Sequence, residues 1–224
     1  MASTELHEDA TSPELLSLLR QLMAEPVLGT FVLAGGTALA LYFGHRRSLD
    51  LDLFCREEFA AAALAEALRG RHRLESLTIE PNTVRCAIQG IRVDFLAHRY
   101  DTLERPLEIA GIRIFGLPDL AAMKLNAIAN RGSRKDFWDV AELLSHFSFE
   151  EMLAFHARKY PDTNLWQVRK SVAYFADAEP EPDPVVLNGR TWETVREQVA
   201  GDPFGDTRLP CPSFEERRIS TCAR

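Results

Sequence analysis

The sequence lacks any apolar run of the length that a membrane-spanning helix requires, which is about 18 uninterrupted residues. We expect no signal peptide, because the first ten of its 224 residues, MASTELHEDA, are polar and acidic rather than basic and then apolar. From these two absences we expect a cytoplasmic protein with no membrane partner.

The four cysteines form no Cys-x-x-Cys pair and show no metal-ligand spacing; they are Cys55, Cys86, Cys211 and Cys222. Reduced thiols are therefore expected. An excess of positive charge is also missing, since 26 Lys and Arg face 33 Asp and Glu for a net charge of −7. This excludes a protein coated in basic surface for nonspecific nucleic-acid binding. Local basic patches stay open, either Arg131 with Arg134 and Lys135 or His45 with Arg46 and Arg47.

Apolar residues make up 46% of the sequence, which is enough to form a core. The length of 224 residues fits one domain or a domain with a modest appendage. Residue periodicity predicts a mixed α/β N-terminal half and a helical C-terminal half. A helix is expected to start at Ser12-Pro13. Further helices are predicted at 37–43, 57–69, 118–130, 135–146, 149–159, 165–175 and 192–199. Strands are predicted at 31–34, 49–54, 74–80, 83–88, 91–97, 107–109 and 112–115.

Two acidic residues, Asp50 and Asp52, alternate with apolar residues in the run Leu49–Phe54. Successive side chains of a strand point to opposite faces, so both carboxylates share one face and the leucines take the core side. Two carboxylates about 7 Å apart repel each other unless a cation lies between them. Oxygen ligands of this kind suit magnesium.

A third acid, Asp94, lies on the predicted strand Ile91–Ala97. Three carboxylates on neighbouring strands can hold two metal ions, which neutralise a triphosphate and stabilise both ends of a phosphoryl displacement. Gly35-Gly36, between a strand and a helix, either allow backbone N–H groups to approach phosphate or simply form a tight turn. Thr37 is a helix cap or a phosphate donor, and Ser48 is a turn residue or a donor to metal-bound phosphate.

A second dense block is LPDLAAMKLNAIANRGSRKDFWDVAELL at residues 117–144. Asp136 and Asp139 are three residues apart and can share a helix face, as can Lys124 and Arg131. Surface ion pairs from Arg131 and Lys135 to the two aspartates would explain most of the block. They do not explain Lys124, whose apolar neighbours imply burial and hence an anionic partner.

Together these motifs resemble the AbiEii/AbiGii toxin-type nucleotidyltransferases. The segments that carry the likeness are GGTALAL, GHRRSLDLDLF, VDFL and the block at 117–144, and it spans roughly residues 31–199. The resemblance implies an α/β (α+β) fold with a polymerase-β-like nucleotidyltransferase core and a mixed sheet. It also implies a core at 1–116 and a helical C-terminal lobe at 117–200 that completes the active site. The segment 201–224 shows no clear periodicity, so we expect a loose tail there.

The resemblance further implies roles for individual residues. Ser48 and Asp50 match the family's Ser-x-Asp motif, Asp52 the second metal-binding acid, and Asp94 the third strand acid. Lys124 matches a helical lysine proposed to contact the triphosphate, and Asp139 the late essential aspartate. Residues assigned to the nucleotide are Gly35, Gly36, Thr37, Ser48, Lys124, Arg131 and Asp136.

The expected activity is magnesium-dependent transfer of a nucleoside monophosphate from an NTP to a hydroxyl of RNA, including the acceptor end of tRNA, or of protein. A toxin role with a cognate antitoxin is part of this expectation. One alternative is a catalytically silent nucleotide-binding or antitoxin-interaction module. Another is a glycosyltransferase, which leaves Gly35-Gly36 and Lys124 unexplained. A haloacid-dehalogenase-like phosphatase would want Thr or Val where Phe54 stands.

Overall fold

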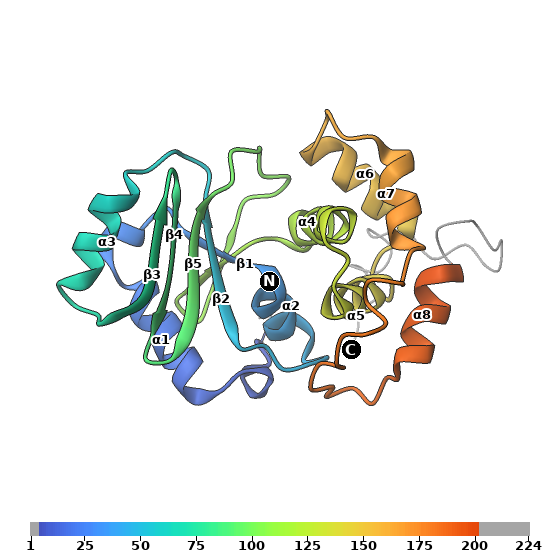
Figure 1. Ribbon diagram of the computed structural model, residues 1–224, viewed down its shortest axis with the longest axis horizontal. Coiled ribbons are helices and arrows are strands. Elements are labelled where there is room, and N and C mark those ends of the chain that lie inside the picture. The colour runs from blue at the N-terminus through green and yellow to red at the C-terminus, as the bar shows by residue number, and fades with distance from the viewer. Residues whose placement is uncertain (1–4, 202–224) are drawn as a thin grey trace. The chain divides into compact units, whose positions relative to one another are not determined.

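The computed structural model describes residues 5–201 (Figure 1). In it the chain divides into two compact units, which contain residues 5–120 and 121–201. Among the residues described, no helix is both long enough and apolar enough to cross a membrane. The tail predicted to be loose after Gly201 lies outside them.

The thiols that the structure describes, Cys55 and Cys86, are buried and free. Burial is the largest cause that raises the pKa of each to about 11, so both stay protonated at neutral pH. Cys211 and Cys222 lie outside the described residues.

The first unit is built on a seven-stranded mixed sheet with the order β3-β4-β5-β2-β1-β7-β6. β2 pairs in parallel with β5, β1 pairs in parallel with β7, and the other neighbours are antiparallel. The strands are β1 Val32–Ala34, β2 Asp50–Cys55, β3 Leu74–Glu80, β4 Thr83–Ile88, β5 Ile91–Ala97, β6 Leu107–Ile109 and β7 Ile112–Ile114. Every predicted strand is therefore present, with ends that differ by at most one residue.

The tight turns of this sheet follow from local sequence. Gln89 and Gly90 have φ values of 54° and 77°, the left-handed conformation that closes the β4–β5 hairpin, as predicted. Ala110 and Gly111, with φ values of 50° and 78°, close the β6–β7 hairpin in the same way.

Three α-helices accompany the sheet, namely α1 Pro13–Met23, α2 Gly35–Phe43 and α3 Ala61–Arg69. The Ser12 hydroxyl caps α1 by accepting from the N–H of Leu15 at 3.1 Å, which confirms the predicted start. Two short 3-10 helices, Glu8–Ala10 and Pro26–Leu28, were not predicted.

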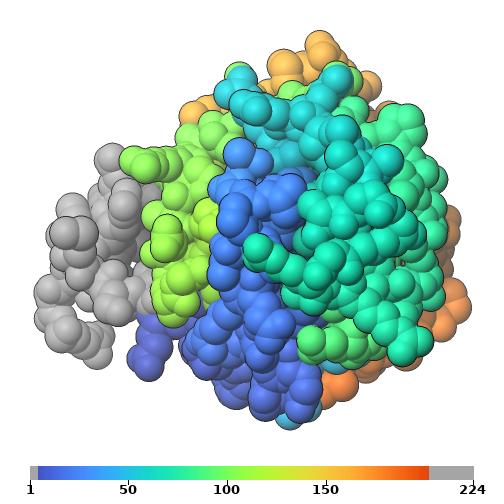
Figure 2. All heavy atoms as spheres, turned by 90° about the vertical axis from the view of Figure 1, so that its left-hand side faces the viewer, coloured from blue at the N-terminus to red at the C-terminus, as the bar shows by residue number. Residues whose placement is uncertain are grey.

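Helix α3 starts later than the predicted Glu57. The N–H of Phe59 donates instead to Asn82 Oδ1 at 2.9 Å, which holds this segment outside the helix. The ends of α1 and α3 lie side by side, because Glu25 accepts from Arg71 at 2.7 Å, and Figure 2 shows the N-terminal segment next to the α3–β3 region.

The second unit is helical. Its elements are α4 Leu117–Asn130, which begins in the first unit, α5 Arg134–Leu143, α6 Phe149–Lys159, α7 Leu165–Val172 and α8 Trp192–Gly201. The predicted helices all exist, although α5 and α7 end three residues earlier than expected. An aromatic cluster forms part of its core, with Trp138 stacked on Trp192 at a ring-centroid distance of 5.4 Å.

Candidate active site

The three strand acids lie on one face of the sheet. Residues of β2 alternate between half-buried and buried, so Asp50 and Asp52 share a face, as predicted. Leu51 and Leu53 are buried on the opposite face. Leu49, which was also expected in the core, is 70% exposed because it precedes the first residue of the strand.

The parallel pairing of β2 with β5 brings the third acid beside the first two. In its register Asp52 is the partner of Asp94, and Asp50 is the partner of Arg92. The Asp94 carboxylate is 18% exposed, and its Oδ1 is buried without a hydrogen-bond partner among residues 5–201. Burial, with a smaller contribution from Asp50, raises the pKa of Asp94, although Arg92 and Arg85 oppose the shift.

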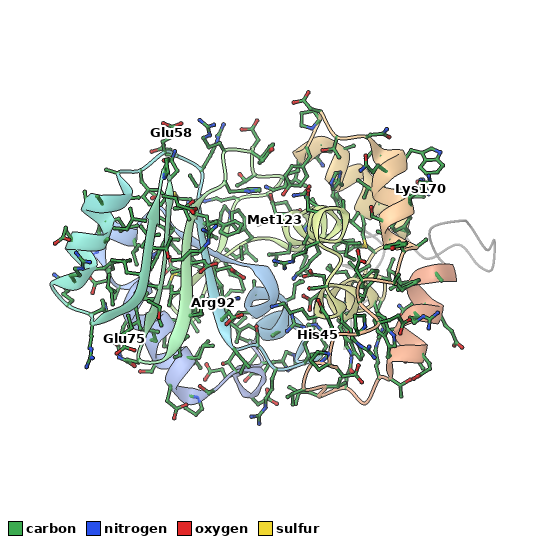
Figure 3. The ribbon with its side chains drawn as sticks, viewed as in Figure 1. His45, Glu58, Glu75, Arg92, Met123 and Lys170 are labelled. Carbon is green, nitrogen blue, oxygen red and sulfur yellow. The ribbon has the colours of Figure 1, made fainter. Side chains whose placement is uncertain are left out.

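Two arginines, which the sequence analysis did not single out, accompany these acids. Arg92 Nη2 donates to Asp50 Oδ2 at 2.6 Å, and Arg85 Nε lies 3.8 Å from Asp94 Oδ2. The spacing Arg-x-Asp within β5 was the available signal, because residues two apart on a strand share a face. Figure 3 labels Arg92 on this strand.

Gly35 makes room for one of the acids. Its φ is +67°, and a Cβ on Gly35 would collide with the Asp52 carboxylate. A Cβ on Gly36 would collide with the guanidinium of Arg46, whose end is more easily displaced. The Gly-Gly pair thus lets the backbone at the start of α2 approach Asp52 closely, a contact that a side chain at position 35 would prevent.

Thr37 ties α2 to the start of β2. Its hydroxyl is hydrogen-bonded to Ser48 Oγ at 2.8 Å and donates to the carbonyl oxygen of Asp50. Helix α2 begins at Gly35 without a side-chain cap, so the interpretation of Thr37 as a helix cap is wrong. Ser48 is also buried, and its N–H donates to the Ala10 carbonyl at 3.0 Å.

The turn His45-Arg46-Arg47 is not a basic surface patch. His45 and Arg46 are 1% and 3% exposed, and only Arg47 lies at the surface. Arg46 Nη1 donates to the Arg47 carbonyl at 3.1 Å, so the guanidinium makes a hydrogen bond within the turn. The sequence could not reveal this burial because three adjacent polar residues normally indicate an exposed loop.

A second ionic cluster lies within the helical unit. Lys124 on α4 is 5% exposed, and its ammonium lies 2.9 Å from Asp136 Oδ1 and 2.7 Å from Asp139 Oδ2 on α5. Both aspartates are fully buried, so they are not surface residues as expected, although the expected pair of Arg131 with Asp136 is present beside the two pairs with Lys124. The prediction that Lys124 needs an anionic partner is confirmed.

Asp136 has further partners. Arg131 Nε donates to its Oδ2 at 2.8 Å, and the Ser133 hydroxyl donates to the same oxygen at 2.8 Å. Burial alone would raise the pKa of Asp136, but Lys124 and Arg131 outweigh it and hold the pKa well below its usual range. The carboxylate therefore stays ionised at any pH at which the protein functions.

Arg134 is a packing residue rather than part of a nucleic-acid surface. Its guanidinium lies 4.4 Å from the ring centroid of Trp192, and its Nε lies 2.7 Å from Asp183 Oδ1. Its backbone N–H also donates to Glu181 at 2.7 Å. The expected basic patch of Arg131, Arg134 and Lys135 therefore loses two of its cations to intramolecular partners.

The carboxylates that could bind a metal ion are present, but they are not grouped into a binding site. Among residues 5–201 no three His, Cys, Asp or Glu side chains are arranged as a ready-made metal site. One reason why the three acids do not form such a site is that Asp50 is paired with Arg92. A divalent ion at the strand acids would have to replace this ion pair.

Comparisons with known proteins identify a family and a fold. A family model described as "Nucleotidyl transferase AbiEii toxin, Type IV TA system" matches residues 17–102 and 78–216. An uncharacterised protein of Aquifex aeolicus is 34% identical over 169 residues, which are 73% of this chain and 82% of the relative.

Two solved structures share the architecture. The nucleotidyltransferase toxin MenT4 from Mycobacterium tuberculosis H37Rv aligns with a TM-score of 0.51 at 15% identity, over 99% of this chain and 90% of its own. JHP933 from Helicobacter pylori aligns with a TM-score of 0.50 at 20% identity, over 98% and 99%. The mixed sheet with its helical second unit is therefore a polymerase-β-like nucleotidyltransferase fold, as the resemblance implied.

Proposed function

The chain belongs to the nucleotidyl transferase AbiEii toxin family, and we propose that it moves a nucleoside monophosphate from an NTP to a hydroxyl of RNA or protein with the help of magnesium. Membership of this family makes the chain a nucleotidyltransferase, whereas its metal, its nucleotide and its acceptor are proposals. The proposal depends most on one observation, that Asp52 and Asp94 are register partners on parallel strands with Asp50 on the same face.

Asp50, Asp52 and Asp94 are the residues that would hold magnesium. Their chemistry fits, because carboxylate oxygens are the ligands that magnesium prefers. The unpartnered Oδ1 of Asp94 and the space that Gly35 leaves beside Asp52 support the assignment. Bound ions would neutralise the triphosphate and stabilise the attacking and leaving oxygens of an in-line displacement.

The remaining groups of this face would bind and orient. The backbone N–H groups at Gly35 and Gly36 would approach phosphate oxygens, since neither residue carries a side chain of its own. Thr37 and Ser48 hold the start of β2 against α2, which fixes the backbone from which Asp50 and Asp52 project. Asp94 would serve as a metal ligand or accept the proton of the attacking hydroxyl.

For the second ionic cluster the resemblance supplies the role. Lys124 would contact the triphosphate, and Asp139 and Asp136 would orient its ammonium. Arg131 would act through Asp136, to which it donates two hydrogen bonds. The expected partners are accordingly an NTP, an RNA such as the acceptor end of tRNA or a protein, and a cognate antitoxin.

The test is label transfer. The purified protein is incubated with magnesium and each of the four α-³²P-labelled NTPs, together with total RNA and cell protein, and the products are separated on gels. Asp52→Asn is the variant of interest. Asp9→Asn, which removes an exposed carboxylate of the same unit, is the matched control.

We expect label on one class of acceptor with the wild type and Asp9→Asn, and at least a hundredfold less with Asp52→Asn. Label on RNA and label on protein are separate bands, so the gel identifies the acceptor. Equilibrium dialysis with the same labelled NTPs measures binding: nucleotide binding without transfer would support the silent module, and neither binding nor transfer with any NTP would overturn the proposal.

A further inference from the structure

We propose that Arg92 is a nucleotide-binding residue that serves as the counter-ion of Asp50 before the metal–nucleotide complex binds and then passes to a phosphate of the nucleotide. This inference rests on the proposed function, because it assigns Asp50 to the metal. It predicts that the metal enters together with the nucleotide rather than ahead of it.

The pairing follows from strand register rather than from a chance surface contact. Asp50 and Arg92 are direct partners in the parallel β2–β5 ladder, on the face that carries Asp52 and Asp94. The ladder therefore fixes their backbones side by side, and Arg92 Nη2 reaches Asp50 Oδ2 at 2.6 Å. Figure 3 labels Arg92 on β5.

Arg85 extends the same pattern by one strand. It is the register partner of Asp94 in the antiparallel β4–β5 ladder, and its Nε lies 3.8 Å from that carboxylate. Its Nη1 donates to Glu80 at 2.9 Å, so Arg85 is shared between Glu80 and Asp94, whereas Arg92 donates its hydrogen bond to Asp50. Three carboxylates and two guanidinium groups thus occupy one face of three neighbouring strands.

The Arg92–Asp50 pair can be exchanged. The Arg92 side chain is 59% exposed and that of Asp50 is 31% exposed, so water screens the pair and it contributes little to stability. A divalent ion carries twice the charge of a guanidinium and can displace it. However, the displaced guanidinium is tethered to β5 and would repel the ion, because like charges a few ångströms apart repel even in a solvated site.

A nucleotide removes this conflict. Its phosphates supply negative charge next to the ion, and a guanidinium matches phosphate oxygens through two parallel N–H donors. Arg92 then loses one anionic partner and gains another. Free metal should consequently bind weakly, whereas the metal–nucleotide complex should bind better with Arg92 than without it.

The test measures two affinities of the full-length protein, which Arg92→Gln should shift in opposite directions. Binding of free Mn²⁺ is followed by the loss of its electron paramagnetic resonance signal, and binding of Mn·ATP, Mn·CTP, Mn·GTP and Mn·UTP by equilibrium dialysis. In Arg92→Gln we expect about fivefold tighter binding of free Mn²⁺. For the Mn·NTP that the wild type prefers we expect about tenfold weaker binding.

Two further variants make the result specific. Arg69→Gln removes an exposed arginine of the same unit that pairs with Glu66 on α3, and it should change neither affinity. Arg92→Lys keeps the charge but loses the planar fork, so free Mn²⁺ should bind as in the wild type and Mn·NTP about threefold more weakly. It also covers the case in which Arg92→Gln does not fold.

Opposite shifts in Arg92→Gln, with Arg69→Gln unchanged, support the proposal. Shifts in the same direction, or no shift, overturn it while leaving the proposed function intact. A wild type that binds none of the four Mn·NTP complexes overturns both, so the two failures are distinguishable.

Discussion

Gly35→Ala is the substitution that most directly tests the geometry of the strand acids. Gly35 adopts φ +67°, and a Cβ there would collide with the carboxylate of Asp52. The methyl group therefore cannot be accommodated unless Asp52 leaves its position or the turn at the start of α2 shifts. Either movement displaces an acid that we assign to the metal.

The magnitude has two parts. A residue with a Cβ in the left-handed region costs about 1 to 2 kcal/mol relative to Gly. Forcing Asp52 away from its rotamer adds about 0.5 to 1.5 kcal/mol. We therefore expect Gly35→Ala to lower the free energy of unfolding by about 1.5 to 3.5 kcal/mol. Since a displacement of about 1 Å can reduce catalysis about 100-fold, transfer should fall by about that factor.

Gly90→Ala is the matched control. Gly90 also has a positive φ, +77°, but a Cβ there would meet nothing within 4 Å. It therefore carries the backbone cost alone, about 1 to 2 kcal/mol, and should leave transfer within about twofold of the wild type. Urea denaturation followed by fluorescence measures stability, and label transfer at a temperature where each variant is folded measures activity.

The reasoning would be refuted if folded Gly35→Ala transferred label as well as Gly90→Ala. That result would mean that Asp52 does not need its observed position. Equal loss of activity in the two variants would also contradict it, because backbone strain rather than contact with Asp52 would then be responsible.

Three further outcomes are expected. Lys124→Met should lower the free energy of unfolding by about 3 to 5 kcal/mol in urea, because it takes the ammonium from two fully buried carboxylates, of which Asp136 keeps Arg131, whereas exposed Lys135→Met should change it by less than about 0.5 kcal/mol. His156 is buried without a hydrogen-bond partner among residues 5–201, and burial lowers its pKa to about 4. Because the unfolded chain takes up that proton near pH 6.5, the full contribution of His156 is present above pH 6.5, and about 3 kcal/mol is lost as the pH falls to 4. In His156→Phe the unfolding free energy should fall less steeply over that window, and equal pH dependence would contradict the assignment. Thr37→Val removes the donor to the Asp50 carbonyl and should lower stability by about 1 to 2 kcal/mol and reduce transfer, while Thr37→Ser restores both; an active Thr37→Val would show that this link is dispensable.

The elements of the fold were predictable where local sequence decides them. Strands β3, β4 and β5 have the predicted bounds because their turns need left-handed residues that the sequence supplies, such as Gln89-Gly90. The shared face of Asp50 and Asp52 was predictable for the same reason, since alternation along a strand is a local property. The late start of α3 was not, because it depends on Asn82, which is distant in sequence.

It was harder to predict from the sequence which strands lie beside each other. Arg92 becomes the partner of Asp50 only through the parallel β2–β5 register, across a gap of 42 residues. The same applies to the Thr37 hydroxyl, whose contact with the Asp50 carbonyl replaces the predicted cap. A sequence pattern states which face a residue occupies, whereas the partner across that face depends on the order of the strands.

The two ionic clusters differ in a way that bears on their roles. Lys124 and Arg131 carry two positive charges, and Asp136 and Asp139 carry two negative charges, so these four side chains together carry no net charge. Its carboxylates are fully buried, and removal of one partner leaves an uncompensated buried charge.

No charged side chain of such a cluster can leave its partner without a large loss of stability. Any contribution of Lys124 to phosphate binding must therefore come from a fixed orientation of its ammonium rather than from surplus charge. Asp50 and Asp94 are partly exposed and lie beside partly exposed arginines, so they can exchange counter-ions at little cost. It follows that substitutions in the helical cluster should affect folding before catalysis, whereas substitutions of Asp50 or Arg92 should affect ligand affinity in a protein that remains folded.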